Sequence, residues 1–136
     1  MSLLTRRGRL ADRTVIARVA ALMVVEAATL AVASALHLSG SVQGRSAPFN
    51  AGHAGVAEAI IGGVLAAGAV VMFRPPAPGR STTGFAIAGF LVGLNFTARG
   101  GHLPDIAYHI TMSPVLIGSL IVLVRVGPSA RAGSKG

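Results

Sequence analysis

Ionisable and polar side chains are concentrated in one short segment, NFTARGGHLPDIAYH (residues 95–109), which lies between two apolar runs. It carries one guanidinium (Arg99), two imidazoles (His102 and His109) and one carboxylate (Asp105). A carboxylate beside an imidazole orients the ring and raises its basicity, so such a pair can exchange a proton near neutral pH. The segment therefore predicts acid/base chemistry or the capture of a ligand's polar end.

Two further carboxylates lie inside apolar runs. An ionisable group within a membrane costs roughly 2.5 to 3.5 kcal/mol on insertion scales, so Glu26 and Glu58 each indicate a function. Glu58 follows His53 by five residues. Glu26 precedes His37 by eleven residues, close to three helical turns, so these two share one helix face.

Helical spacing brings the polar residues together in pairs. Asp105 and His109 are four residues apart, as are Asn95 and Arg99, so each pair lies on one helix face. If the chain reverses at each connection, all four histidines meet at the same end of the protein. We predict proton transfer by three side chains, Glu58, Asp105 and His109. We predict ligand contacts from five others, His37, His53, Asn95, Arg99 and His102.

Structural alternatives exist for the same residues. Glu58 could have a purely structural role, either by pairing with Arg99 or by hydrogen-bonding a neighbouring helix, since charges inside membranes are usually paired. Asp105 could cap the first turn of a helix that starts near Pro104. Asn95 could hold two helices together, and histidines at helix ends could simply sit at the membrane interface.

Metal and haem sites are also chemically conceivable. Two histidines could ligate a haem, and three nitrogen and oxygen ligands could hold a metal ion. The spacing gives little support, because there is no H-x-x-x-H and Pro104 separates His102 from His109. The chain has no cysteine, which excludes disulfides and thiolate sites. We therefore predict no metal ligands, and the sequence identifies no cofactor.

Composition indicates a membrane protein of one domain. Hydrophobic residues make up 52% of the 136 residues and charged residues only 12%, with 18 glycines, so a water-soluble fold would lack polar surface. The net charge of +8 does not indicate nucleic-acid binding, because the basic residues lie at the termini and in turns. One Tyr and no Trp also leave no stacking platform for bases.

Four apolar runs separated by polar connections predict four membrane spans, at about 15–38, 53–73, 82–98 and 104–126. Residues 1–13 form a basic cytoplasmic arm in this interpretation, 14–126 the membrane domain, and 127–136 a disordered cytoplasmic tail. Short connections favour an all-α, up-down-up-down four-helix bundle. The bilayer is thus the first expected partner.

Lys and Arg are distributed unevenly between the two ends of this bundle. Ten lie at the end that holds both termini, whereas only Arg45 and Arg99 lie at the other. The positive-inside rule then places both termini in the cytoplasm and the protein in the cell (plasma) membrane.

Small residues predict close helix contacts. Gly89 and Gly93 form a G-x-x-x-G step, and Ala59, Gly63 and Ala67 form a second ridge. Such ridges could also support a homo-oligomer.

The second span, GVAEAIIGGVLAAGAVVMFR, has a Glu before a glycine pair, a small-residue ridge and then a basic turn. In this, and in length and span count, the chain resembles small four-span proteins of the DoxX-like type. The resemblance implies a membrane protein linked in some members to quinone-dependent oxidation of sulfur compounds. The Ala/Gly/Arg-rich composition is similar to that of proteins from high-GC bacteria.

Three functions fit these features. The first is a binding protein, such as a redox accessory subunit, whose outward pocket holds a small apolar ligand of quinone or isoprenoid type. The second is a membrane-embedded acid/base isomerase or cyclase acting on a lipophilic substrate. The third is a haem or metal carrier.

Overall fold

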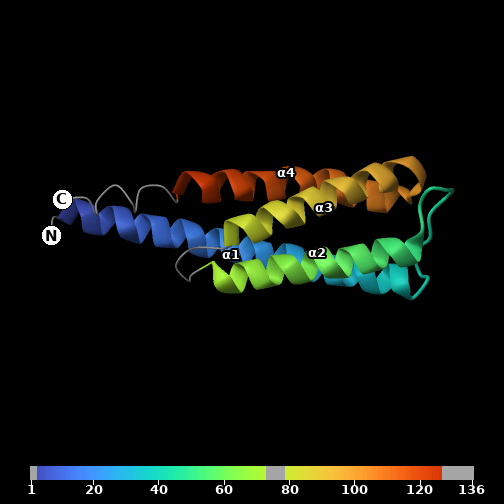
Figure 1. Cartoon of the computed structure of the whole chain (residues 1–136), viewed down its shortest axis with the longest axis horizontal. Helices are drawn as coiled ribbons and strands as arrows, with labels where there is room; N and C mark the ends of the chain where they lie inside the picture. Colours follow the sequence, from blue (N-terminus) through green and yellow to red (C-terminus); the bar gives the residue numbers. More distant parts are fainter. Residues whose placement is uncertain (1–2, 73–78, 127–136) are drawn as a thin grey trace.

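The computed structural model describes residues 3–72 and 79–126, and these form four helices. The helices are α1 (Leu3–Leu38), α2 (Ala51–Val71), α3 (Gly79–Gly100) and α4 (Leu103–Val126). Consecutive helices run in opposite directions, so the start of α1 and the end of α4 lie at the same end of the bundle (Figure 1). The predicted all-α four-helix bundle is confirmed.

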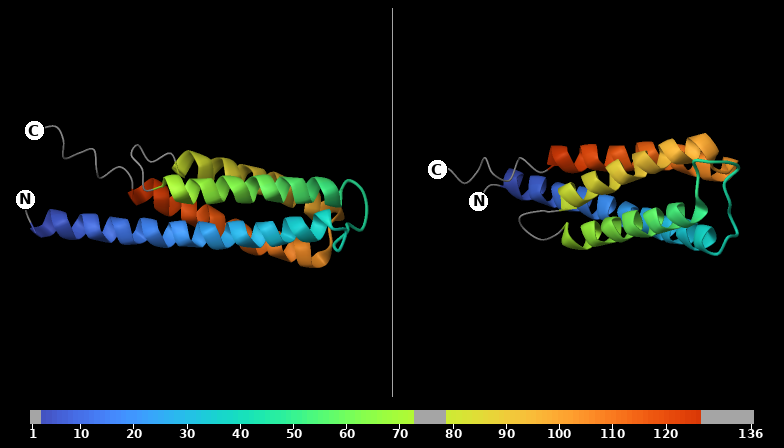
Figure 2. Two further views of the ribbon diagram at one scale, coloured as in Figure 1. Left: turned by 90° about the horizontal axis from the view of Figure 1, so that it is seen from below. Right: turned by 45° about the vertical axis from the view of Figure 1, so that its right-hand side comes forward.

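The four helices pack as a ring of neighbours. Helix α1 contacts α2 and α4, and α3 contacts the same two helices from the other side (Figure 2). The α1–α2 connection and the short α3–α4 turn lie together at the end opposite the termini. We call this the outer end, and the opposite one the inner end.

Three of the four helices are long and apolar enough to cross a membrane: Arg13–Leu38, Ala51–Val71 and Leu103–Arg125. The protein is therefore a membrane protein, as its composition predicts. Within the described residues, helix α3, which contains the predicted span 82–98, is not among these candidates.

Helix boundaries differ from the predicted ones mainly at the N-terminus. Helix α1 begins at Leu3, so the predicted basic arm is largely the first part of this helix. Its 36 residues span about 54 Å and extend beyond the other helices (Figures 1 and 2). Helix α2 begins at Ala51 because the Asn50 side chain accepts a hydrogen bond from the His53 backbone N–H at 3.0 Å. The predicted tail 127–136 lies outside the described residues.

Helices α1 and α2 approach closely through glycine. A Cβ added at Gly62 would lie 3.3 Å from the Ala27 carbonyl oxygen, so a larger residue would push the two helices apart. The Ser34 hydroxyl donates a 2.7 Å hydrogen bond across this interface to the Gly55 carbonyl. The prediction that Gly63 makes such a contact within the bundle is wrong: it is exposed and faces open space, because it lies on the opposite side of α2.

The two outer connections are tied together by Arg45. Its Nε donates to the Gly101 carbonyl at 2.8 Å, and its backbone N–H donates to the Gly100 carbonyl at 2.7 Å. These carbonyls end α3 and have no partner within the helix. The contact therefore satisfies the helix end and holds the α1–α2 connection over the bundle.

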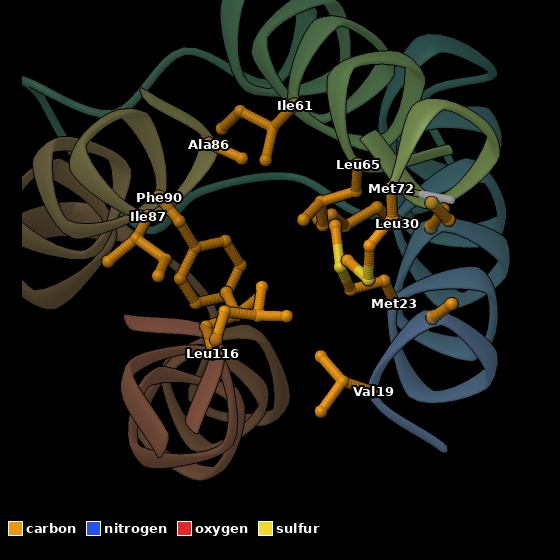
Figure 3. Packing of buried hydrophobic residues seen from close by; sticks show 14 residues of the cluster. Val19, Met23, Leu30, Ile61, Leu65, Met72, Ala86, Ile87, Phe90 and Leu116 are labelled. Atoms are coloured by element: carbon orange, nitrogen blue, oxygen red, sulfur yellow. The ribbon is translucent and has the colours of Figure 1, made fainter. Parts of the chain in front are cut away.

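The apolar core joins the two helix pairs. Figure 3 shows Met23 and Leu65, from α1 and α2, on one side and Phe90 and Leu116, from α3 and α4, on the other. All four side chains are almost completely buried. This core holds the four helices in place, and the helices in turn position the polar residues at the outer end.

Candidate functional site

His37 connects three helices near the outer end of the bundle. Its Nδ1 lies 2.7 Å from Glu58 Oε2, a hydrogen bond between α1 and α2. On the opposite edge of the ring, Nε2 lies 3.6 Å from Asp105 Oδ2 of α4. The three residues are 3–8% exposed. A single imidazole therefore lies between two buried carboxylates.

Asp105 also contacts His109, one turn further along α4. His109 Nδ1 lies 3.4 Å from Asp105 Oδ1 and 2.9 Å from the Asp105 carbonyl oxygen. A carbonyl only accepts hydrogen bonds, so we assign the ring proton to Nδ1 and leave Nε2 as the acceptor. Phe90 stacks on the ring at 4.6 Å between centroids. We call His37, Glu58, Asp105 and His109 the polar cluster.

Several polar atoms of this cluster lack partners. His37 Nε2, Glu58 Oε1 and Asp105 Oδ2 are buried and form no hydrogen bond. No Lys or Arg in residues 13–72 or 82–126 lies within ion-pair distance of either carboxylate. Buried polar atoms without a partner are uncommon and costly, so these three atoms indicate a bound proton, ion or ligand group.

A cavity of about 350 Å³ lies between α2 and α3, beneath the α1–α2 connection. Its walls are mostly apolar and include Ile61, Val92 and Phe96. Two members of the polar cluster, Glu58 and His109, also line it. The cavity thus combines an apolar wall with two ionisable side chains.

A second hollow, of about 450 Å³, opens at the outer end beside the α1–α2 connection. His37 lines it, and Phe49 lines both this hollow and the cavity. The Phe49 ring lies 5.7 Å from the His37 ring between centroids. The polar cluster is therefore reached from two sides, at His37 from the outer end and at Glu58 and His109 from the cavity.

The eight predicted site residues fall into two groups. The four members of the polar cluster meet, and each is buried. His53 is exposed and lines the cavity, whereas Asn95, Arg99 and His102 are exposed and belong neither to the cluster nor to the cavity lining.

The contacts of Glu58 and Asp105 bear on the structural alternatives. Glu58 hydrogen-bonds His37 of the neighbouring helix α1, in agreement with one form of the structural alternative, and it does not pair with Arg99. Asp105 does lie in the first turn of α4, but its side chain contacts His37 and His109.

Tyr108 and Thr29 extend the polar contacts and are not predicted by our sequence analysis. The Tyr108 hydroxyl lies 2.9 Å from Thr29 Oγ1, which joins α4 to α1. Tyr108 also meets the His109 ring edge-on at 5.6 Å between centroids. The available signal was that the single tyrosine of the chain directly precedes His109.

Glu26 lies on α1 three turns before His37 and is only 3% exposed. Neither of its carboxyl oxygens has a hydrogen-bond partner. The spacing of eleven residues places Glu26 on the same face of α1 as His37. Glu26 is therefore a buried acidic group separate from the polar cluster.

No family model, no curated protein and no solved structure matches this chain. The resemblance of the second span to DoxX-like proteins stays a prediction. The functional assignment is therefore based on the chemistry of the polar cluster and the cavity.

Proposed function

We propose that this protein binds a small, largely apolar ligand of quinone or isoprenoid type in the cavity between α2 and α3. The supporting observation is that an apolar-walled cavity contains two buried ionisable side chains, Glu58 and His109. The ligand's polar end would meet these side chains, while its apolar part lies along the wall. The resemblance to DoxX-like proteins adds the proposal that the protein serves a redox system as an accessory subunit.

The size and chemistry of the cavity support a ligand with a ring and a short branch. A volume of about 350 Å³ lies at the lower end of the range of small-molecule sites. Glu58 Oε1 is buried without a partner and can accept a hydrogen bond from a hydroxyl group. The assigned tautomer of His109 also leaves Nε2 as an acceptor, so the two hydroxyl groups of a quinol or the hydroxyl of an isoprenoid alcohol suit them.

The proposed topology has four spans with both termini in the cytoplasm. Helices α1, α2 and α4 are the candidate spans, and α3 joins the inner end of α2 to the outer end of α4. A chain that connects opposite sides of the membrane must cross it, so α3 would cross with its polar residues near its two ends. By sequence, ten of the twelve Lys and Arg residues fall on the side of the predicted topology that holds both termini, which supports a cytoplasmic position for that side and a plasma-membrane location for the protein.

Ligand binding can be tested with protein purified in detergent and a benzoquinol that carries one isoprenyl unit, using isothermal titration calorimetry. Gly93→Leu should abolish binding, because a Cβ at Gly93 already reaches 3.7 Å from His109 Nε2 and the longer side chain enters the cavity. Gly118→Leu is the matched control, since nothing lies within 4 Å of a Cβ there. Absent binding by the native protein, or equal binding by both variants, would contradict the proposal.

An acid/base isomerase or cyclase is the second candidate. Glu58 and His109 line the same cavity and are linked through His37 and Asp105. One group could remove a proton from a substrate while the other returns a proton at a second position. This arrangement is what a double-bond shift in an isoprenoid requires.

Deuterium incorporation separates the two candidates. An enzyme should introduce solvent deuterium into an isopentenyl-bearing probe in D2O, as measured by mass spectrometry. Glu58→Gln and His109→Gln should stop this exchange while calorimetric binding persists. If the native protein binds the probe but introduces no deuterium, the enzyme candidate is excluded and only the binding function remains.

An outward ridge on α2 supports self-association. Ala59, Gly63 and Ala67 are all exposed and lie on one face of the helix. Small-residue ridges allow close helix contacts in lipid, so a homo-oligomer is part of the proposal. Gly63→Leu should then shift the native protein to a smaller species in light scattering; an unchanged monomeric mass in both proteins would contradict it.

A further inference from the structure

We propose that His37, Glu58 and Asp105 bind a divalent first-row transition metal ion near the outer end of the bundle, where Glu58 also lines the cavity. Each residue comes from a different helix, and one ligand atom of each lies within 4.8 Å of the other two. Zinc ligands lie about 2.0–2.2 Å from the ion, which places tetrahedral neighbours about 3.5 Å apart. His37 Nε2 and Asp105 Oδ2 already have a separation of 3.6 Å. Glu58 Oε2 lies 2.7 Å from His37 Nδ1, so binding of the same ion by Glu58 would require its carboxylate to turn away from that nitrogen.

The unpartnered atoms of the cluster support a bound cation independently of these distances. Each proposed ligand residue contributes one buried atom without a hydrogen bond: His37 Nε2, Glu58 Oε1 and Asp105 Oδ2. All three residues are more than nine-tenths buried. A cation coordinated by these residues would provide the interaction that the buried groups lack.

Charge balance leads to the same conclusion. Glu58 and Asp105 place two carboxylates in an apolar environment, and among the residues with described side chains no Lys or Arg pairs with them. His37 and His109 are the titratable groups within ion-pair distance of them, from α1 and α4. A divalent ion with neutral imidazoles neutralises both carboxylates at once. Protons compete with the ion, because protonation of a carboxylate or an imidazole occupies the same lone pair that would bind the metal.

The donor set indicates which ions would bind. One imidazole nitrogen and two carboxylate groups suit Zn²⁺, Mn²⁺ or Fe²⁺, and the absence of cysteine from the sequence removes the thiolates that favour Cu(I). His109 is a positioning residue here, because its Nδ1 lies 3.4 Å from Asp105 Oδ1 and would orient that carboxylate. Glu58 lines the cavity, so a held ion would face whatever enters it.

Metal analysis of the purified full-length chain tests the site. Protein stripped with a chelator and dialysed against Zn²⁺ should retain a single ion per chain by inductively coupled plasma mass spectrometry. His37→Gln, Glu58→Gln and Asp105→Asn should each abolish retention. His109→Gln should weaken the affinity about 10–100-fold, as expected for an outer-shell residue.

Two controls distinguish coordination from general loss of structure. Glu26→Gln removes a carboxylate that is as buried as Glu58, and His102→Gln removes an exposed imidazole. Both should retain the ion. No ion in the native protein, or an equal loss in Glu26→Gln and Glu58→Gln, would overturn the metal site.

Cobalt provides a measurement that does not depend on folded variants. Co²⁺ added to native protein should give a saturable visible absorption band that Zn²⁺ displaces, and an unsaturable signal would overturn the site. This inference does not rest on the proposed ligand. Binding of the quinol probe by native protein that retains no Zn²⁺ after dialysis against the ion would refute the metal site and leave the binding function intact.

Discussion

The two ends of the bundle use the same helices in different ways. At the outer end, α1, α2 and α4 are joined by the contacts of His37 with Glu58 and Asp105. Further in, they are joined by close-packed apolar side chains such as Leu65 and Leu116. Lipid is as apolar as leucine, so burial of apolar side chains contributes less to helix association here than in water.

This difference identifies what fixes the helices relative to one another. Apolar contacts tolerate small shifts, whereas the 2.7 Å bond between His37 and Glu58 requires one register of α1 against α2. The Ser34 hydrogen bond to Gly55 lies on the same interface and favours the same register. We therefore expect the outer end to determine register and chemistry, and the apolar end to supply general cohesion.

The largest effect should come from removing the shared partner at the outer end. His37→Leu leaves Glu58 and Asp105 buried without their imidazole, and breaking a buried pair in this way typically costs 3–5 kcal/mol. The free energy of unfolding in mixed detergent micelles should fall by about this amount. His53→Leu is the matched control, since His53 is exposed and should change stability little. Equal effects of the two substitutions would show that the contacts of His37 with the two carboxylates do not stabilise the bundle.

Packing at the apolar end should matter less than the polar contacts. Leu65 is fully buried, and Leu→Ala costs about 2–5 kcal/mol in water-soluble cores. Part of that cost is transfer from water, which is small in lipid, so we expect about 2 kcal/mol for Leu65→Ala. The same unfolding assay measures it, and Leu22→Ala, at a more exposed position, is the control. A larger loss of unfolding free energy for Leu65→Ala than for His37→Leu would show that apolar packing, not the polar contacts, contributes more to the stability of the bundle.

The fold could be predicted from sequence because its main determinants are local. Apolar runs longer than a bilayer and proline-containing connections define helices without knowledge of their neighbours. The predicted first span, 15–38, agrees with the candidate span Arg13–Leu38, whereas the helix itself continues through the basic segment back to Leu3 because arginine is a good helix former.

The candidate site was only partly predictable, because it depends on which face each helix presents. The i, i+4 spacing does bring Asp105 and His109 together within α4. The contact of Glu58 with His37 depends instead on the rotation of α2 against α1. Asn95 and Arg99 have the right spacing, but α3 presents that face outwards. Phe49 enters through a connection whose path is fixed by Arg45, and composition alone does not show such a path.

Glu26 is an exception to this division between the two ends, because its buried carboxyl group lies away from the polar cluster. Both of its oxygens are buried without partners, and such groups typically cost about 1–3 kcal/mol. Glu26→Met should therefore increase the free energy of unfolding by about 1–2 kcal/mol, since Met fills similar space without a polar group. Glu58→Met, which breaks a pair, should instead destabilise the protein. A loss of stability in Glu26→Met would show that Glu26 has a partner that stabilises it.

The smallest effect should come from the contact that extends the polar cluster towards Glu26. Thr29→Val keeps the side-chain shape but removes the hydroxyl that lies 2.9 Å from the Tyr108 hydroxyl. Hydrogen bonds between membrane helices contribute about 0.6 kcal/mol on average, so the free energy of unfolding should fall by about that amount. A double-mutant cycle with Tyr108→Phe isolates the pair, because neither substitution changes the stacking of Phe90 on His109. A coupling energy near zero would confine the polar interactions to the cluster itself. A coupling energy well above 1 kcal/mol would instead mean that the polar end of the bundle extends about two turns further into the membrane than the cluster alone.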